Sequence, residues 1–191
     1  NNARCGISLI FKAKRLRWLI LYSSVIGFAL VAILQTYQLF FLNRKIPIKY
    51  FGIIYFLLYM TSSISSKVAH HFKRFNGYKM FMLFLFMLFL TPLLMLIPAK
   101  MFIIIIIVPR IVIGIYPSIA KEYINKEIEI DRATSFSLRS LFAKIPQVVL
   151  LPYIGYLIDN KGLNYSLIIV AVIIFILGMI LLASQYFIKK S

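Results

Sequence analysis

Acidic side chains are the scarcest charged groups of this chain. The 191 residues include only five Asp and Glu against 22 Lys and Arg, which gives a formal net charge of +17. The five carboxylates are Glu122, Glu127, Glu129, Asp131 and Asp159. All five lie at or beyond the ends of apolar segments, so the sequence has no pair of aspartates inside an apolar segment and excludes catalysis by such a pair.

Other residues that enzymes and metal sites need are also absent. The single cysteine, Cys5, cannot form an internal disulfide bond. The sequence has no Gly-x-Ser-Gly nucleophile pattern and no His-Glu-x-x-His metal motif. His70 and His71 are adjacent, so on a helix they point about 100° apart and do not form an i, i+4 ligand pair. We therefore expect no enzyme activity, no metal and no cofactor.

Long apolar segments occupy the rest of the chain. Hydrophobic residues make up 62% of it and charged residues 14%, and the mean hydropathy is +0.91. The six apolar segments are approximately 17–42, 48–66, 80–97, 101–120, 138–158 and 164–187. Each approaches the ~20 residues that a helix needs to cross a lipid bilayer. The sequence predicts an all-α integral membrane protein, with a basic segment over 1–16 and a bundle of six transmembrane helices over 17–191. Because it starts with Asn1 rather than Met, we expect the reading frame to continue upstream.

The basic residues are unevenly divided between the two ends of these helices. Sixteen Lys and Arg fall in 1–17, 67–79, 121–144 and 189–190, whereas five fall at the opposite helix ends. The side of a membrane that is richer in Lys and Arg is normally cytoplasmic. This bias predicts that both termini are cytoplasmic and that the membrane is a plasma or inner membrane. Charges at the ends of apolar helices also argue against a nucleic-acid-binding protein, which collects them on a solvated face.

Polar residues are sorted among the six segments. The third and sixth are almost purely apolar, whereas the other four contain Gln, Tyr, Ser, Arg or Lys, as expected for two copies of a three-helix unit. In the first segment Gln35 and Gln38 share a helical face with Gly27 and Phe28, and each glutamine needs a partner helix, water or a substrate. In the second segment Tyr59 lies on a similar polar stripe, which completes with Tyr55, Ser62 and Ser66. Packing between helices is the alternative explanation for the serines.

Arg110 is the one charged residue that is expected deep inside the membrane. It lies about ten residues from either end of the fourth segment, between Pro109 and Pro117. A charge at this depth costs several kcal/mol unless it faces a cavity or a partner. The chain's own five carboxylates lie too far toward the helix ends to pair with it, so we expect Arg110 either to line a water-filled cavity or to pair with an acid on a part of the protein outside this sequence; snorkelling from a shifted helix is the alternative. In the fifth segment Lys144 and Gln147 are one turn apart, and Lys144 is either an interfacial anchor or a cavity residue.

Several stretches resemble the major facilitator superfamily of transporters. They are the RxxxG pattern at 110–114, DRATSFSL from Asp131, LPYIGYLIDNKG from Leu151 and the connection HFKRFNGYK from His71. That connection lacks the acidic residue that usually precedes the basic pair in the family. The resemblance covers essentially the whole chain and is unspecific for substrate.

The resemblance implies a C-terminal half of a twelve-helix transporter, folded as two inverted three-helix repeats. The expected function is secondary active transport of a small solute by alternating access, as a symporter or antiporter. Because the polar residues are cationic or amides, we expect an anionic or neutral solute, contacted by Arg110, Gln35 and Gln38, with Tyr59, Lys144 and Gln147 behind them. The expected partners are lipid and either an N-terminal six-helix half or a second copy. The alternative is a self-contained six-helix protein that acts as a homodimeric carrier or as a non-transporting scaffold or sensor.

Overall fold

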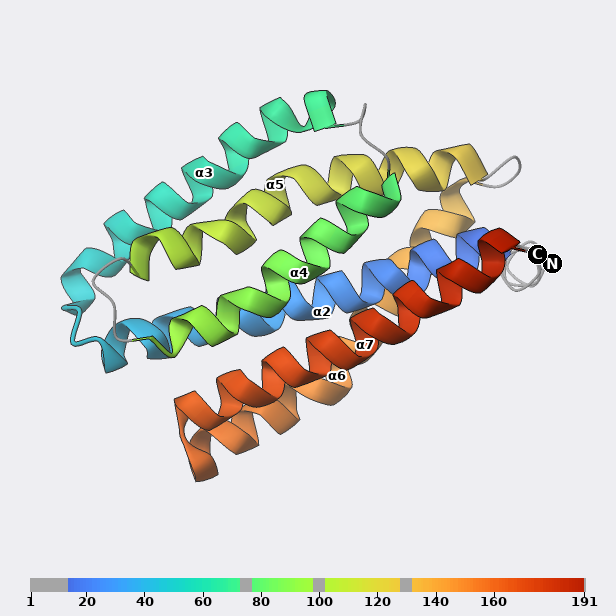
Figure 1. Cartoon of the computed structure of the whole chain (residues 1–191). Coiled ribbons are helices and arrows are strands. Elements are labelled where there is room, and N and C mark those ends of the chain that lie inside the picture. The colour runs from blue at the N-terminus through green and yellow to red at the C-terminus, as the bar shows by residue number, and fades with distance from the viewer. Residues whose placement is uncertain (1–13, 73–76, 98–101, 128–131, 191) are drawn as a thin grey trace.

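The described part of the chain is a bundle of α-helices. The computed structural model describes residues 14–72, 77–97, 102–127 and 132–190 (Figure 1). The helices are α2 (Lys14–Asn43), α3 (Phe51–Phe72), α4 (Gly77–Met95), α5 (Phe102–Glu127), α6 (Arg132–Lys161) and α7 (Leu163–Lys190), with a short 3-10 helix at Ile48–Tyr50. Most of the predicted basic segment 1–16 lies outside the described residues, but its last three residues already belong to α2.

The helices confirm the six predicted segments in order, although most are longer than predicted. Five contain a stretch long and apolar enough to cross a membrane: Lys14–Asn43, Ile48–Phe72, Ile104–Lys126, Ser140–Lys161 and Leu163–Ser184. The third predicted span is a shorter apolar helix, Lys79–Met95, because α4 ends at Met95 and not at residue 97 as predicted. At 1.5 Å per residue, the 19 residues of α4 still measure about 28 Å. These lengths and compositions indicate a helical membrane protein.

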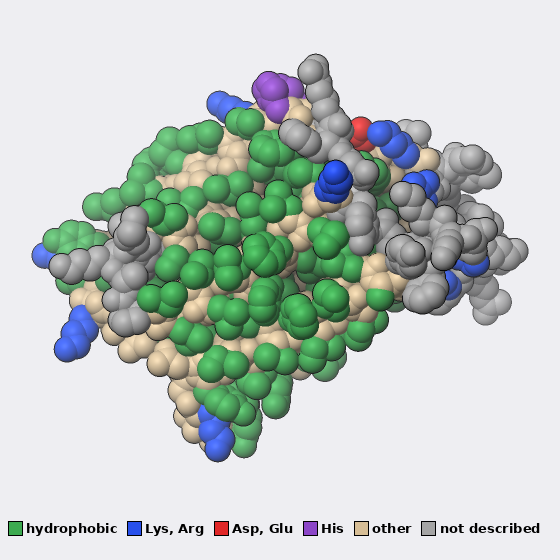
Figure 2. All heavy atoms as spheres, viewed as in Figure 1, with side chains coloured by type: hydrophobic (Ala, Val, Ile, Leu, Met, Phe, Trp, Pro, Cys, Tyr) green, Lys and Arg blue, Asp and Glu red, His purple; other side chains and the backbone are tan. Residues whose placement is uncertain are grey.

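The outer surface agrees with that assignment. On the face shown in Figure 2, apolar side chains cover the middle of the bundle, and most Lys and Arg side chains lie toward its ends. Exposed apolar side chains include Phe56, Val148 and Ile180, which are 62%, 72% and 59% exposed. In water, a protein with such a surface would tend to aggregate, whereas in a membrane or a complex the surface would be covered by lipid or by a partner protein.

Helix α2 forms the centre of the bundle. It packs against α4, α5, α6 and α7. Of the 18 consecutive residues that make up its most apolar stretch, 72% are buried. Helices α3 and α6 lie at the flanks, where α3 packs mainly against α5, and α6 packs against α2 and α7. In the corresponding 18-residue stretch of each of these two helices, only 11% of the residues are buried. Burial thus follows the number of neighbouring helices and not polarity, because α3 and α6 are two of the four helices with polar residues.

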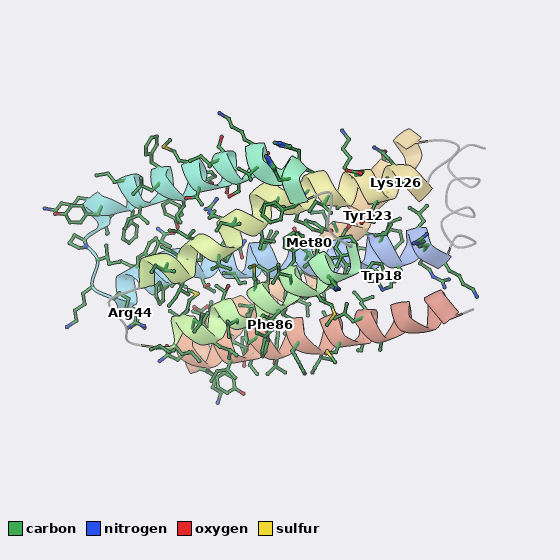
Figure 3. The ribbon with its side chains drawn as sticks, turned by 45° about the horizontal axis from the view of Figure 1, so that its top comes forward. Trp18, Arg44, Met80, Phe86, Tyr123 and Lys126 are labelled. Atoms are coloured by element: carbon green, nitrogen blue, oxygen red, sulfur yellow. The ribbon has the colours of Figure 1, made fainter. Side chains whose placement is uncertain are left out.

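Aromatic side chains hold α2 against its neighbours through hydrogen bonds. Trp18 Nε1 donates a hydrogen bond to the carbonyl of Leu181 in α7 (2.6 Å), and Tyr22 Oη donates to the carbonyl of Phe81 in α4 (2.5 Å). Tyr116 Oη in α5 donates to Ser23 Oγ (2.7 Å). Figure 3 shows Trp18 near Met80 and Tyr123 at this end of the bundle. Buried Trp and Tyr need such partners, so these bonds fix which faces of the helices meet.

At the other end of the bundle, α2 is tied to the end of α4. Arg44 Nη2 donates to the carbonyl oxygens of Met95 (3.1 Å) and Ile97 (2.5 Å). The last carbonyls of a helix have no partner within the helix, so a cation here satisfies them and interacts favourably with the helix dipole. Figure 3 places Arg44 far from Lys126, which lies at the opposite end.

Helix α2 ends in a left-handed turn that is made by a lysine. Lys45 has φ = 56°, its N–H bonds to the carbonyl of Leu42, and the N–H of Ile46 bonds to the carbonyl of Phe41. This pair of bonds is the Schellman arrangement, in which glycine is the usual residue at the left-handed position. Pro47 follows and prevents the helix from continuing.

Because Lys45 adopts a conformation that favours glycine, Lys45→Gly should stabilise the protein. We expect the free energy of unfolding to rise by about 0.5–1 kcal/mol, since glycine relieves the steric cost of the left-handed region. Thermal unfolding of the purified chain in detergent measures the change. Lys49→Gly, in the 3-10 helix, is the control and should not stabilise; equal effects of both changes would contradict this explanation.

Helices α6 and α7 are joined by a single residue. Helix α6 ends at Lys161, α7 begins at Leu163, and Gly162 between them has φ = 84°. The N–H of Gly162 bonds to the carbonyl of Ile158, and the N–H of Ser166 bonds to the carbonyl of Gly162. A residue with a side chain would be strained at this φ, so glycine is what allows so short a reversal of direction.

Candidate functional site

Arg110 lies in the first half of α5, a helix that contains two prolines. It follows Pro109, and Pro117 lies two turns further along α5; neither proline has an N–H for the helix ladder. Arg110 comes eight residues after Phe102, or about 12 Å along the axis. The sequence predicted a position near the middle of the helix. It is nearer the start because α5 extends beyond the apolar segment, through Lys121 and Lys126, to Glu127.

The side chain of Arg110 is buried beneath an aromatic ring. Only 4% of the residue is exposed, and its Cζ lies 4.3 Å from the ring centroid of Tyr59 in α3. Tyr59 itself is 63% exposed. Nε of Arg110 is buried and has no hydrogen-bond acceptor among the described residues. The expected alternatives were an open cavity or an acidic partner. Within the described chain the guanidinium stacks on Tyr59 through a cation–π contact, and both alternatives stay predictions.

The backbone around Arg110 is fixed by side chains from two other helices. Ser62 Oγ in α3 donates to the carbonyl of Arg110 (3.1 Å). Tyr37 Oη in α2 donates to the carbonyl of Ile106, one turn earlier in α5 (2.7 Å). Tyr37 and Tyr55 also lie within electrostatic range of the Arg110 charge. Three tyrosines, on α2 and α3, therefore lie in the neighbourhood of the arginine, and Tyr59 is the one whose ring contacts the guanidinium.

Close contact between α3 and α5 depends on Gly114. A Cβ atom added to Gly114 would lie 2.6 Å from Ser65 Cβ and 2.9 Å from the backbone N of Ser66. Glycine permits this approach because it has no side chain. The approach brings Tyr59 and Ser62 of α3 to Arg110, one turn before Gly114.

Lys144 and Gln147 form a second polar group on another pair of helices. Lys144 Nζ donates to Gln147 Oε1 (3.2 Å), and Lys144 is exposed. Gln147 is half-buried and lies beside Gly27 of α2, since its Nε2 is 3.5 Å from where a Cβ of Gly27 would be. The amide of Gln147 thus fills the space that Gly27 leaves.

Gln35 and Gln38 belong to neither group. Both are exposed, and neither forms a hydrogen bond with another described residue. Phe28, which the helical stripe placed on their face, is fully buried. The predicted site residues therefore fall into three places: Arg110 with Tyr59, Lys144 with Gln147, and the two glutamines.

Sequence reasoning identified Arg110 and Tyr59 but not Tyr37. The signal was present, because a tyrosine inside an apolar segment needs a hydrogen-bond partner. Its partner is a carbonyl 69 residues away in the sequence, which no local pattern indicates. Part of the 71–79 connection, and Asp131 of the 131–138 stretch, lie outside the described residues.

No metal-binding group is present in the described ranges, since no three His, Cys, Asp or Glu residues lie together there. Comparisons of the chain with protein-family models, curated proteins and solved structures find no match.

Proposed function

We propose that this chain is a six-helix half of a secondary transporter, which moves a small anionic or neutral solute by alternating access. The observation that carries the proposal is a correspondence between helix contacts. Helix α2 packs on α6 and α7, and α5 packs on α3 and α4 in the same way. Helices α4 and α7 pack on each other, as do α2 and α5. Exchanging the first three helices for the last three therefore converts the contacts of α2 with α6 and α7 into those of α5 with α3 and α4, and leaves the α4–α7 and α2–α5 contacts in place. The smaller α6–α7 and α2–α4 contacts have no comparable counterpart among the described residues.

Two glycines support the same correspondence. Gly27 of α2 lies where α6 approaches, and Gly114 of α5 lies where α3 approaches. A polar pair follows each glycine at the same spacing, Gln35 and Gln38 in one helix and Glu122 and Asn125 in the other. Because each unit has an odd number of helices, the second unit runs in the opposite direction. Inverted repeats of this kind are a recurring architecture of secondary transporters.

The exposed flanks of the bundle support a second half. In transporters built from inverted repeats, the substrate lies between structural repeats near the middle of the membrane. Helices α3 and α6 present large exposed apolar side chains, including Phe56 and Val148. We propose that these flanks face an N-terminal six-helix half or a second copy of the chain, as well as lipid.

The charges support the solute class and the orientation. The one buried ionised side chain of the described spans is Arg110, and the other expected contacts are amides, a tyrosine and Lys144. A cationic, amide-lined site favours an anion or a neutral solute over a cation. The excess of Lys and Arg at one side supports cytoplasmic termini in a plasma or inner membrane.

Solute flux into vesicles tests this proposal. The purified chain would be incorporated into lipid vesicles and offered labelled acetate, phosphate or glucose, with protein-free vesicles as the control. We expect saturable uptake of at least one solute, which unlabelled solute on the opposite side accelerates, because alternating access exchanges solute across the membrane. Native mass of the same preparation distinguishes one copy from two.

Two results would contradict the proposal. Folded protein that assembles as two copies and still moves none of these solutes would favour a scaffold or a sensor. Flux that neither saturates nor responds to solute on the opposite side would indicate a channel instead of a carrier.

A further inference from the structure

Arg110 has an unusual combination of burial and unmet hydrogen-bonding capacity. A guanidinium group carries five N–H donors and no acceptor. Arg110 is 4% exposed, its Nε is buried, and no described residue offers that atom an acceptor. Glu122 and Asp159, the two acidic residues with described side chains, lie toward helix ends, and neither forms an ion pair with Arg110. A buried charge in this situation favours an anion as its partner.

The group that covers Arg110 is one that a ligand can replace. Tyr59 contacts the guanidinium through its ring face at 4.3 Å and is itself 63% exposed. Its hydroxyl forms no hydrogen bond with another described residue. A cation–π contact is weaker than a charge-assisted, two-pronged hydrogen bond between arginine and a carboxylate. Rotation of one exposed side chain would therefore open the guanidinium to an incoming anion.

The rest of the site is fixed in place. Ser62 and Tyr37 hold the α5 backbone on both sides of the Arg110 side chain by bonds to the carbonyls of Arg110 and Ile106. Gly114 keeps α3 in contact with α5 one turn away. The guanidinium is thus held on a fixed backbone beneath a displaceable cover, an arrangement that lowers the ordering cost of binding.

We propose that Arg110 is a carboxylate-binding site which Tyr59 covers when it is empty, so that the ring must move aside before a ligand reaches the guanidinium group. This inference rests on the proposed transport function, in which the ligand is the solute. A monocarboxylate fits the site because its two oxygens match the planar guanidinium fork. It also neutralises the single positive charge, whereas a dianionic phosphate would leave a net negative charge within an apolar span.

Chemical labelling of Arg110 tests the proposal without a known solute. The full chain in lipid vesicles would be treated with phenylglyoxal, which modifies accessible guanidinium groups, and the labelled peptide quantified by mass spectrometry. Labelling at Arg17, which is exposed, serves as the internal reference. Acetate is the carboxylate probe, and inorganic phosphate is the comparison.

Three variants separate the cover from the site. In Tyr59→Ala, we expect Arg110 to be labelled roughly 3- to 30-fold faster than in the unmodified chain, the range that loss of a cation–π contact implies. Acetate should protect Arg110 at a concentration lower by a similar factor, because no ring has to move aside before it binds. Tyr59→Phe keeps the ring and should behave like the unmodified chain. Tyr153→Ala, an exposed tyrosine on α6, is the matched control and should change neither quantity.

The outcomes that would overturn the proposal are distinct. Unchanged labelling in Tyr59→Ala would mean that the ring does not close the site. Labelling that acetate never slows, in the unmodified chain or in a variant, would exclude a carboxylate site, and this measurement does not need Tyr59→Ala to fold. Stronger protection by phosphate than by acetate would overturn the assignment to monocarboxylates.

The same data separate this inference from the proposed function. If acetate protects Arg110 in vesicles that transport nothing, the binding site is supported and the proposed transport function is contradicted. If solute flux is observed and acetate does not protect Arg110, the transport function is supported and the carboxylate site is contradicted.

Discussion

Replacement of Gly114 by alanine is expected to lower the free energy of unfolding by about 3 kcal/mol. The new Cβ would lie 2.6 Å from Ser65 Cβ and 2.9 Å from the backbone N of Ser66, and it would also overlap the carbonyl oxygen of Ser62. Two of these three atoms belong to the α3 backbone, so no side chain can rotate to make room. Helix α3 has to move away from α5, and because α3 packs mainly on α5, few other contacts hold it in place, among them Phe51 and Tyr55 against Phe41 of α2.

Gly155→Ala provides the matched control. Gly155 lies in α6, six residues before the end of the helix, and an added Cβ would meet no atom within 4 Å. Alanine is favoured over glycine in a helix by roughly 0.5–1 kcal/mol, so this variant should be neutral or slightly more stable. Thermal unfolding in detergent compares the two. If both substitutions had the same effect on stability, this would contradict the explanation that the contact between α3 and α5 requires glycine at position 114.

Phe28→Ala in α2 is expected to cost about 2–4 kcal/mol of stability. Phe28 is fully buried in the helix that contacts four others. In a membrane, lipid is as apolar as the protein interior, so association gains no hydrophobic transfer energy. The cost therefore comes from the lost packing contacts and the cavity, and it should fall at the low end of values for water-soluble proteins.

Phe56→Ala tests the same change on an exposed position. Phe56 is on α3 and is 62% exposed, so truncating it removes few contacts within the chain. We expect a change below about 0.5 kcal/mol in the unfolding of the isolated chain. A cost equal to that of Phe28→Ala would contradict the burial described for the two helices and show that the outer face of α3 is packed against another surface.

The helices could be located from the sequence because a span of lipid imposes a minimum length on an apolar segment. Their ends were less predictable, as α5 shows. Its apolar segment stops near Ala120, yet the helix continues to Glu127, where Glu122 and Lys126 form a 3.0 Å ion pair one turn apart. Charged residues continue a helix as readily as apolar ones, so composition marks the membrane and not the end of the helix.

The candidate site was predictable in part. Arg110 could be found because a charge between apolar residues stands out, and Tyr59 because it shares a helical face with Tyr55 and Ser62. That Tyr59 covers Arg110 depends on how α3 crosses α5 at Gly114, which is a contact between distant parts of the sequence. Helical periodicity also placed Phe28 and Gln35 on one stripe, whereas Phe28 is buried and Gln35 exposed. A long helix meets different neighbours along its length, so one stripe does not describe a single environment.

The single-residue reversal at Gly162 limits how the far end of α6 and α7 can be used or altered. Only one residue separates Lys161 from Leu163, so the connection cannot stretch when α6 tilts at this end. Helix α7 must then tilt with it, and the two helices move as one rigid unit. Because the connection is one residue long, no loop projects between the two helices for an antibody or a protease to reach. A reporter tag placed here would have to lengthen the turn, and in doing so would uncouple the two helices.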